Sequence, residues 1–306
     1  MTTERTAAEA FGLLSDETRL DILRTVARAQ HADRERGIAE LSFSEIYDRV
    51  DVDGTSKLSY HLGELTGTFL RKHGDGYGFT HAGEQMVRFI LAENYRGPPD
   101  IGPVEADGTC LRCGETGLEA TLRDQYFALQ CPDCERATFT YRVTPAQARS
   151  HDEEELVEAV TWELAGDLLK MRQGVCPDCA GELDTRVLDL EDVPSGEGVA
   201  ASFATASECR ECLRFLSLPL SHAAAYHPES VAFHWEHGVD VMGTGMWEFH
   251  RHLHEDRWTA DRVDNGEGYR VELRRDSATL RLYLDAQAAV TRTERVQSRD
   301  QRDRRS

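Results

Sequence analysis

The cysteines are the residues whose spacing points most directly to chemistry. Two thiolates three positions apart on a tight turn can reach one metal ion, and two such turns complete a tetrahedral shell of four sulfurs. The first two pairs leave 17 residues between them, which is typical of a zinc site, and the last two leave 29. The sequence therefore predicts two structural zinc sites with four cysteines each. All eight cysteines fall in four C-x2-C pairs: Cys110 and Cys113, Cys131 and Cys134, Cys176 and Cys179, Cys209 and Cys212.

Other chemistry is also open to a C-x2-C pair. A redox dithiol forms where a helix N-terminus lowers the thiol pKa, and a disulfide forms in an oxidising compartment. Here each pair precedes or follows an expected strand, and the pairs come as matched doubles, which favours metal. A closed four-thiolate shell has no open position for a substrate. Since the sequence also lacks a phosphate-binding loop and a nucleophile elbow, we do not expect an enzyme.

Each set of cysteines frames the same order of expected elements. A cysteine turn, two strands, a second cysteine turn and a third strand occur twice, which predicts two zinc ribbons, at residues 104–144 and 175–220. Between them, the residues TPAQ at 144–147 resemble a helix start, with a capping threonine and proline at the first helical position. Residues 145–174 are therefore predicted to form a helical connector.

The stretch GTSKLSYHLGELTGTFLRKHGDGYGFT, residues 54–80, predicts a helix followed by a β-hairpin. Leu58, Leu62 and Leu65 stand at offsets of 0, 4 and 7, which places them on one helix face. A glycine turn then separates two short strands. With further helices expected on both sides, residues 1–96 have the element order of a winged helix-turn-helix.

This stretch also carries side chains that suit a nucleic acid. In a winged helix-turn-helix, one helix enters the major groove, and the flanking groups that bind phosphate fix its register. Residues 54–73 hold three basic side chains and one acidic. We expect double-stranded DNA to contact the helix at about 55–66 and the wing at about 69–80. The candidate DNA contacts are Ser56, Lys57, Ser59, Tyr60 and His61 on the helix, and Arg71, Lys72, His73 and Tyr77 on the wing.

Two alternatives remain open for these regions. The leucine-rich helix and the hairpin can simply fill a core. The winged region can also be a protein-interaction module, with the ribbons as a module that binds protein or RNA of the transcription machinery.

The motifs SDETRLDILRTV, FSEIYDRV and SKLSYHLGELTGTFLRKHGDGYGFTHAGEQ together resemble the ArsR-type winged helix-turn-helix, in the version common in archaeal regulators. The resemblance covers about residues 8–94. It implies a transcription regulator that forms a homodimer through its terminal helices. The whole order resembles haloarchaeal proteins that join such a domain to a zinc-ribbon-like region. Metal-sensing members carry paired cysteines on the helix before the recognition unit; SFSEIYDRV has none, so the family's metal-sensing site is not expected here.

The net charge of −20 fits that halophilic resemblance. The chain has 55 acidic and 35 basic side chains, and only three of the basic ones are lysines. An acidic excess with little lysine is typical of adaptation to molar salt, where the Debye length is about 3 Å. No apolar run approaches the roughly 20 residues that span a bilayer, and the first residues lack an export pattern. We therefore expect a cytoplasmic protein without membrane contact.

The remaining segments complete an expected α+β multidomain chain. Proline and glycine at 97–103 predict a linker, residues 221–290 a small α+β region, and residues 291–306 a disordered basic tail. Seven of the 12 histidines lie at 222–254. They lack the H-E-x-x-H spacing of metalloproteases, so surface or partly buried positions are expected for them.

Overall fold

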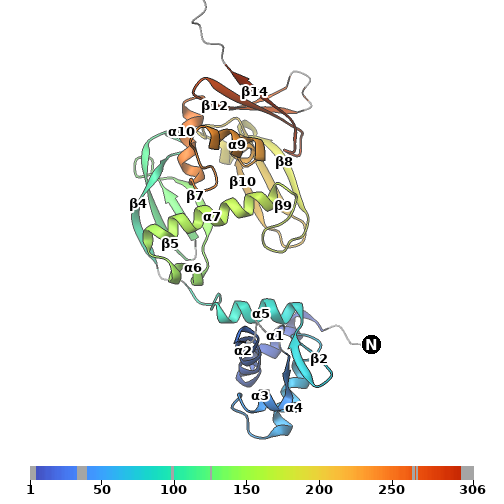
Figure 1. Ribbon diagram of the computed structural model, residues 1–306. Coiled ribbons are helices and arrows are strands. Elements are labelled where there is room, and N and C mark those ends of the chain that lie inside the picture. The colour runs from blue at the N-terminus through green and yellow to red at the C-terminus, as the bar shows by residue number, and fades with distance from the viewer. Residues whose placement is uncertain are drawn as a thin grey trace, which may run out of the picture. The chain divides into compact units, whose positions relative to one another are not determined.

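The computed structural model describes residues 5–32, 40–97, 100–124, 126–263, 266 and 268–297. The chain divides into two compact units, Met1–Gly97 and Pro98–Ser306 (Figure 1). Both units combine helices with antiparallel sheets, so the expected α+β class is observed. Within the described ranges, no helix is both long enough and apolar enough to cross a bilayer.

The first unit is a set of helices against a small three-stranded sheet of order β1-β3-β2. Its core joins Ile22 and Leu23 of α2 to Leu58, Leu62 and Leu65 of α4, and all five side chains are buried. The leucine spacing therefore does place one face of α4 inside the unit. The elements are α1 (Ala7–Gly12), η1 (Leu13–Ser15), α2 (Glu17–Ala32), β1 (Leu41–Ser42), α3 (Phe43–Tyr47), α4 (Thr55–Leu65), β2 (Leu70–His73), β3 (Gly76–Phe79) and α5 (His81–Leu91).

The second unit begins with the segments that hold the cysteines. A four-stranded sheet of order β4-β5-β6-β7 carries the first set, and a three-stranded sheet of order β10-β9-β8 carries the second. In each sheet the neighbouring strands are antiparallel. The strands are β4 (Ile101–Thr109), β5 (Thr116–Arg123), β6 (Tyr126–Gln130), β7 (Ala137–Arg142), β8 (Leu183–Asp189), β9 (Phe203–Cys209) and β10 (Phe215–Pro219).

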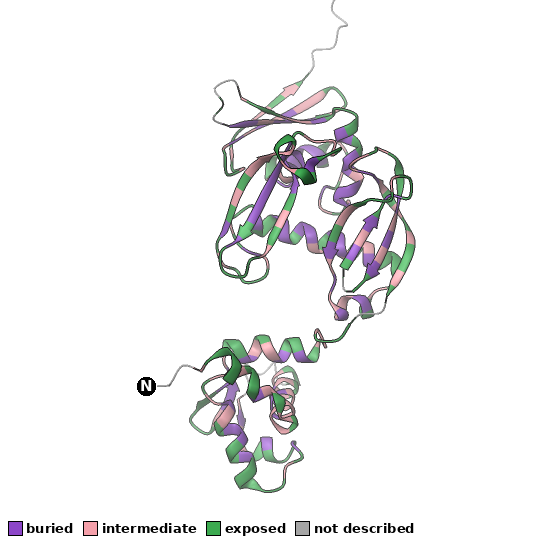
Figure 2. Ribbon diagram, turned by 180° about the vertical axis from the view of Figure 1, so that it is seen from behind, coloured by how far each residue is buried: buried purple, intermediate pink, exposed green. Residues whose placement is uncertain are grey.

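Helix α7 (Glu153–Met171) follows α6 (Pro145–Ser150) and runs past both sheets (Figure 1). Leu156, Val160, Leu164 and Leu168 form its buried face, visible as the purple side of the helix in Figure 2. Asp152 caps the helix, because its side chain accepts a hydrogen bond from the backbone N–H of Glu155. The buried face of α7 thus packs into the core that it shares with the two cysteine-bearing sheets.

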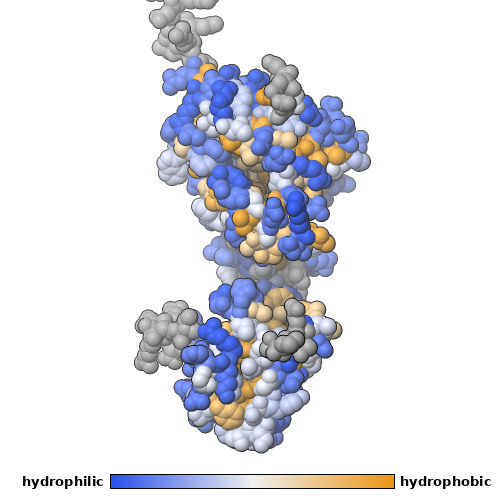
Figure 3. All heavy atoms as spheres, turned by 90° about the vertical axis from the view of Figure 1, so that its right-hand side faces the viewer, coloured by the Kyte–Doolittle hydropathy of each residue, from blue (hydrophilic) through white to orange (hydrophobic). Residues whose placement is uncertain are grey.

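The C-terminal part of the second unit is a four-stranded sheet of order β11-β12-β13-β14 with short helices packed on it. One continuous hydrophobic cluster joins this sheet to α7 and to both cysteine-bearing sheets. Hydrophilic residues predominate on the outer face that Figure 3 shows. The elements of this C-terminal part are α8 (Leu220–Ala225), α9 (Pro228–Glu236), η5 (Met246–Phe249), α10 (His250–His254), β11 (Trp258–Arg262), β12 (Tyr269–Arg275), β13 (Ala278–Leu284) and β14 (Val290–Gln297). Two short helices, η3 (Leu190–Asp192) and η4 (Pro194–Gly196), lie in the connection between β8 and β9.

Two expected boundaries are wrong. The linker expected at 97–103 is shorter, because β4 already begins at Ile101 and pairs there with Leu122. The disordered tail expected from residue 291 instead begins as strand β14, which pairs with β13 as far as Gln297. An edge strand needs only one paired side and keeps polar side chains, so β14 looks like a tail in the sequence. The rest of the expected tail, residues 298–306, lies outside the described residues, as do residues 98–99 of the linker.

Candidate metal centres and nucleic-acid surface

Each cysteine pair sits on the same kind of tight turn. In all four turns the N–H of the first cysteine bonds the carbonyl five residues on, at 2.8–3.0 Å. The residue after the second cysteine has a positive φ, namely Gly114 at 80°, Glu135 at 57°, Ala180 at 60° and Leu213 at 61°. Its N–H bonds back to the carbonyl of the first cysteine. This backbone turns both sulfurs of a pair to the same side.

The sulfurs meet as two clusters of four. One cluster contains Cys110, Cys113, Cys131 and Cys134, and the other contains Cys176, Cys179, Cys209 and Cys212, with all ligand atoms of a cluster within 4.8 Å of one another. Across the turns, Sγ–Sγ distances are 3.6–3.7 Å in the first and 3.5–3.6 Å in the second. Four sulfurs at about 2.3 Å from a central zinc would stand about 3.8 Å apart. Both clusters are therefore compatible with zinc, and their separations are too long for disulfide bonds.

Backbone N–H groups favour the thiolate form at one cysteine of each cluster, whereas the pKa values of Cys113, Cys131, Cys179 and Cys212 are raised. The N–H of Cys212 is the main cause that lowers the pKa of the Cys209 thiol to about 7. At Cys110, burial opposes ionisation, but N–H groups of Cys113 and Arg112 prevail and lower the pKa of the thiol to about 7. Thiolate is the form that binds metal. Both clusters thus hold a thiol prepared to ionise near neutral pH.

The first cluster is anchored to α10. His254 Nε2 donates to the carbonyl of Cys110 at 2.9 Å, and His250 Nδ1 donates to the carbonyl of Thr109 at 2.9 Å. Gly114 lies against the His254 ring, where an added Cβ would come within 3.2 Å of Nδ1. These contacts bind the first cysteine turn to a helix more than 130 residues later in the sequence.

The histidines of residues 222–254 were expected at surface or partly buried positions; His227, His237 and His254 agree with this, whereas the other four are fully buried. His222, His234, His250 and His252 are 0–2 % exposed. Three of these rings lie within 5.3–5.4 Å of the buried Trp258 ring, centroid to centroid. Burial is the main cause that lowers the pKa of His250 and His234 to about 4 and that of His252 to about 3. Among the described residues, only the two cysteine clusters bring three or more metal-binding side chains together.

The N-terminal unit brings most of the expected DNA contacts to its surface. On α4, Ser56, Lys57 and Ser59 are exposed, and Tyr60 is 61 % exposed, all on the side away from the buried leucines. On β2, Arg71, Lys72 and His73 are exposed. No side chain caps α4 at Gly54. The N–H groups of the first turn therefore have no side-chain acceptor, and they lie at the same end of the helix as Lys57.

Two of the expected contacts are not on that surface. His61 is 4 % exposed, and its Nδ1 lies 3.7 Å from Asp16 Oδ1 inside the unit. It follows Leu58 by three positions and precedes Leu65 by four, so helical geometry places it on the buried face. Tyr77 is 7 % exposed, and Lys72 Nζ lies 5.4 Å from its ring centroid. Tyr77 can therefore support Lys72 but offers little surface of its own.

The structure adds one residue that the sequence did not single out. Glu40 lies along β3, with Oε1 3.6 Å from Arg71 Nε and Oε2 3.8 Å from His73 Nδ1. It occupies the space above Gly76, where an added Cβ would come within 2.8 Å of its own Cβ. In the sequence, only the alternating glycines of GYGF indicate that another group comes close to this strand, and they do not identify that group as Glu40. Glu40 therefore partly neutralises the basic side chains of the β2–β3 hairpin.

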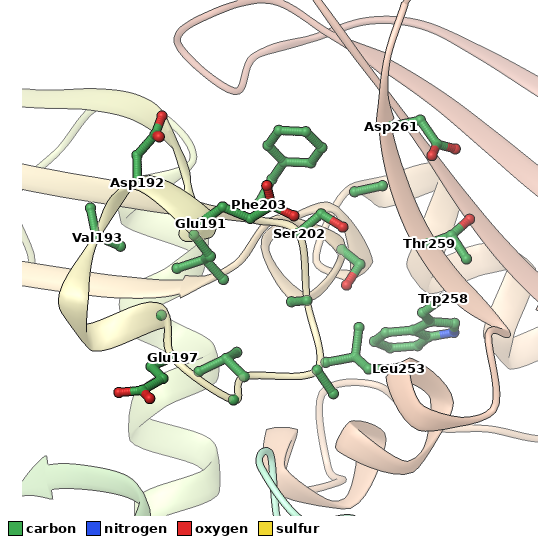
Figure 4. Close-up of a pocket in the computed structure, with 18 of the residues that line it drawn as sticks. Glu191, Asp192, Val193, Glu197, Ser202, Phe203, Leu253, Trp258, Thr259 and Asp261 are labelled. Atoms are coloured by element: carbon green, nitrogen blue, oxygen red, sulfur yellow. The ribbon is translucent and has the colours of Figure 1, made fainter.

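A hollow lies in the second unit, between residues 190–203 and strand β11. Its volume is about 960 Å³, and Figure 4 shows Trp258, Leu253 and Phe203 among its walls. Its charged lining side chains are all acidic: Glu191, Asp192, Glu197, Asp256 and Asp261. An acidic cleft is expected on a chain of this charge.

Fold and site together define a class: a two-unit α+β protein whose N-terminal unit joins helices to a three-stranded sheet and whose second unit holds two four-cysteine clusters. Residues 107–290, well over half the chain, match a family model, and the chain belongs to that family, described as domain of unknown function DUF7351. Residues 7–90 match a second model, domain of unknown function DUF7347. No curated protein and no solved structure matches the chain.

Proposed function

We propose that the protein is a DNA-binding transcription regulator whose N-terminal unit is a winged helix-turn-helix. In this proposal α3 and α4 are the helix pair, α4 enters the major groove, and the β2–β3 hairpin lies over the adjacent backbone. The order of elements supports it, since β1 and the hairpin form one sheet directly beside the helices. The resemblance of residues 8–94 to ArsR-type regulators points to the same role.

The observation that carries the proposal is the exposed face of α4. Leu58, Leu62 and Leu65 bury one side of the helix, so the opposite side presents Lys57, Tyr60 and the serine hydroxyls to solvent. Lys57 takes part in no ion pair within the described residues, so its ammonium group is available to phosphate or to a guanine edge. Serine hydroxyls can donate to phosphate or to base edges.

The wing supplies the backbone contacts in this proposal. Arg71 and Lys72 extend from β2. The Arg71 side chain is 53 % exposed, so its guanidinium can reach a phosphate. The unit as a whole carries 12 basic and 16 acidic side chains. At about 1 M salt the Debye length is about 3 Å, so distant carboxylates are screened and groups in contact decide binding.

We propose that the two cysteine clusters each hold one structural zinc ion. With every ligand position filled by a thiolate, the ion would hold the turns together. The residues that follow each turn enter β-strands of the shared core. The zinc ions would therefore stabilise the second unit, which then serves for spacing or for binding a partner.

We also propose a homodimer through α1 and α5. A hollow of about 700 Å³ lies between these helices, lined by Phe11, Phe69, Met86 and Phe89 among others. Phe11 is 63 % exposed and Phe89 43 %, which is unusual for two phenylalanines beside one apolar groove. A two-fold contact would bury both, and two copies of α4 could then read two half-sites one helical turn apart.

The test is a titration of labelled promoter fragments with the zinc-loaded full chain, followed by fluorescence anisotropy. Lys57→Ala and Arg71→Ala should each weaken binding about three- to tenfold, and Lys57→Ala should also reduce the preference for the best fragment. Lys170→Ala is the matched control, because Lys170 is an exposed lysine on α7 in the other unit. Equal affinities for all four proteins would refute the proposed DNA surface.

A further inference from the structure

A cleft separates the two cysteine-bearing sheets. Its volume is about 510 Å³, and its lining includes every residue of β7 and every residue of β10. Leu164 of α7 and Met246 also line it, so the cleft reaches down to the core. Two lining residues are largely exposed, Tyr126 at 64 % and Phe215 of β10 at 52 %.

Both walls of this cleft are edges of sheets. β7 is the last strand of the order β4-β5-β6-β7, and β10 is the first of the order β10-β9-β8. In the described part of the chain, no further strand pairs with either edge. An open edge presents unpaired N–H and C=O groups, and an extended segment can add to it as another strand. Two such edges face the same cleft here.

The charge of the cleft is the reverse of its surroundings. Of the chain's 35 basic and 55 acidic side chains, 12 and 16 lie in residues 1–97, which leaves 23 and 39 for the second unit. The cleft nevertheless has three arginines among its lining residues and no aspartate or glutamate. These arginines are Arg112, Arg142 and Arg214.

The three arginines differ in what already binds them. Arg142 pairs with Asp178 and, at 3.3 Å, with Asp167, and Arg214 lies 3.7 Å from Asp178. Arg112 instead donates to the backbone carbonyls of residues 195 and 197. In the described structure it has no carboxylate partner. Among the described residues, Arg112 is therefore the arginine of this cleft whose charge no carboxylate compensates.

We propose that this cleft binds an extended segment of a partner protein, in which acidic residues alternate with apolar ones. The segment would lie as a strand between β7 and β10, with hydrogen bonds to the open edges. Its apolar side chains would face Phe139 and Leu216, and its carboxylates would reach Arg112. The volume of one extended residue is the product of a rise of about 3.3 Å, a strand spacing of about 4.8 Å and a thickness of about 10 Å, or about 160 Å³. The cleft of about 510 Å³ therefore holds about three residues of the segment.

The experiment uses an array of decapeptides that alternate Asp or Glu with Val, Ile, Leu or Phe, in both phases, and the zinc-loaded full chain. The best binder is then compared with two matched peptides, one with alternate backbone nitrogens methylated and one with lysine in place of each acid. Methylation removes the main-chain donors and keeps the side chains. We expect both changes to weaken binding at least tenfold. Hydrogen exchange of the complex should slow at 137–142 and 215–219.

Variants of the chain test the same surface. Arg112→Gln should weaken the best acidic peptide about five- to tenfold and leave the lysine peptide unaffected. Because Arg112 also holds the 195–197 backbone, Phe215→Ser serves as a second variant that leaves those hydrogen bonds intact. The proposal is wrong if no array member binds, if the methylated peptide binds equally well, or if protection falls outside β7 and β10. Protection of the same strands by oligouridylate, without protection by any peptide, would assign the cleft to RNA instead. DNA binding by α4 is independent of each of these results.

Discussion

Replacement of Cys110 by serine should remove one of two zinc ions and destabilise the entire second unit. Cys110 is fully buried, and its sulfur lies 3.7 Å from that of Cys134. Zinc binding contributes on the order of 10 kcal/mol or more to the folding of small four-ligand sites, whereas a whole domain is stable by only about 5–15 kcal/mol. One continuous core joins both cysteine-bearing sheets, α7 and the C-terminal sheet. The loss of one ion should therefore unfold the unit cooperatively.

The assay combines zinc content by mass spectrometry with thermal unfolding followed by near-ultraviolet circular dichroism. The parent chain should hold two zinc ions, and Cys110→Ser should hold one and lose its near-ultraviolet signal at a lower temperature. Leu122→Ala is the matched control, because Leu122 is fully buried in the same sheet but binds no metal. Leu122→Ala should lower the free energy of unfolding by about 3–5 kcal/mol, and this variant should retain both ions. A Cys110→Ser chain with two ions, or with one ion and unchanged melting, would refute the reasoning.

Three further predictions follow from other parts of the structure. Lys57→Ala should reduce the slope of log K against log salt for DNA binding by about 0.9, measured by anisotropy between two salt concentrations, whereas Lys170→Ala should leave the slope unchanged. Phe89→Asp should convert the dimer to a monomer in sedimentation experiments, because it places a charge in the apolar groove of α5; a dimer that persists would remove this interface from consideration. Acid should destabilise the second unit: the pKa values of His250 and His234 are lowered to about 4, below the usual 6.5, so the neutral rings stabilise the fold above about pH 6.5, and this stability should be lost as pH falls towards 4. A melting temperature that does not change from pH 7 to pH 4.5 would contradict the last prediction.

The cysteine centres could be predicted from the sequence because their geometry is local. Each turn spans six residues and needs only a short loop with one positive φ, so the C-x2-C spacing already specifies where the two sulfurs of a pair point. The assignment of pairs to clusters then follows from their order. The face of α4 was predictable for the same reason, since Leu58, Leu62 and Leu65 follow the helical period.

One error is local, and the others concern contacts between distant segments. His61 was taken for a surface residue because its type suits DNA, although its position on the helix places it with the leucines. The buried histidines around Trp258 come from α8, α9 and α10, and no local period shows that three helices converge on one ring. Glu40 reaches Arg71 only because β1 pairs with β3. Strand β14 depends on β13 for its pairing, so its polar sequence could not distinguish it from a tail.

The central claim is that the exposed face of α4 reads DNA, and selection from a pool of random duplexes measures it most directly. The zinc-loaded full chain should enrich a two-fold repeat with half-sites about one helical turn apart, and the Lys57→Ala chain should enrich it weakly or not at all. No enrichment by the parent chain, or the same motif enriched equally by Lys57→Ala, would contradict the claim.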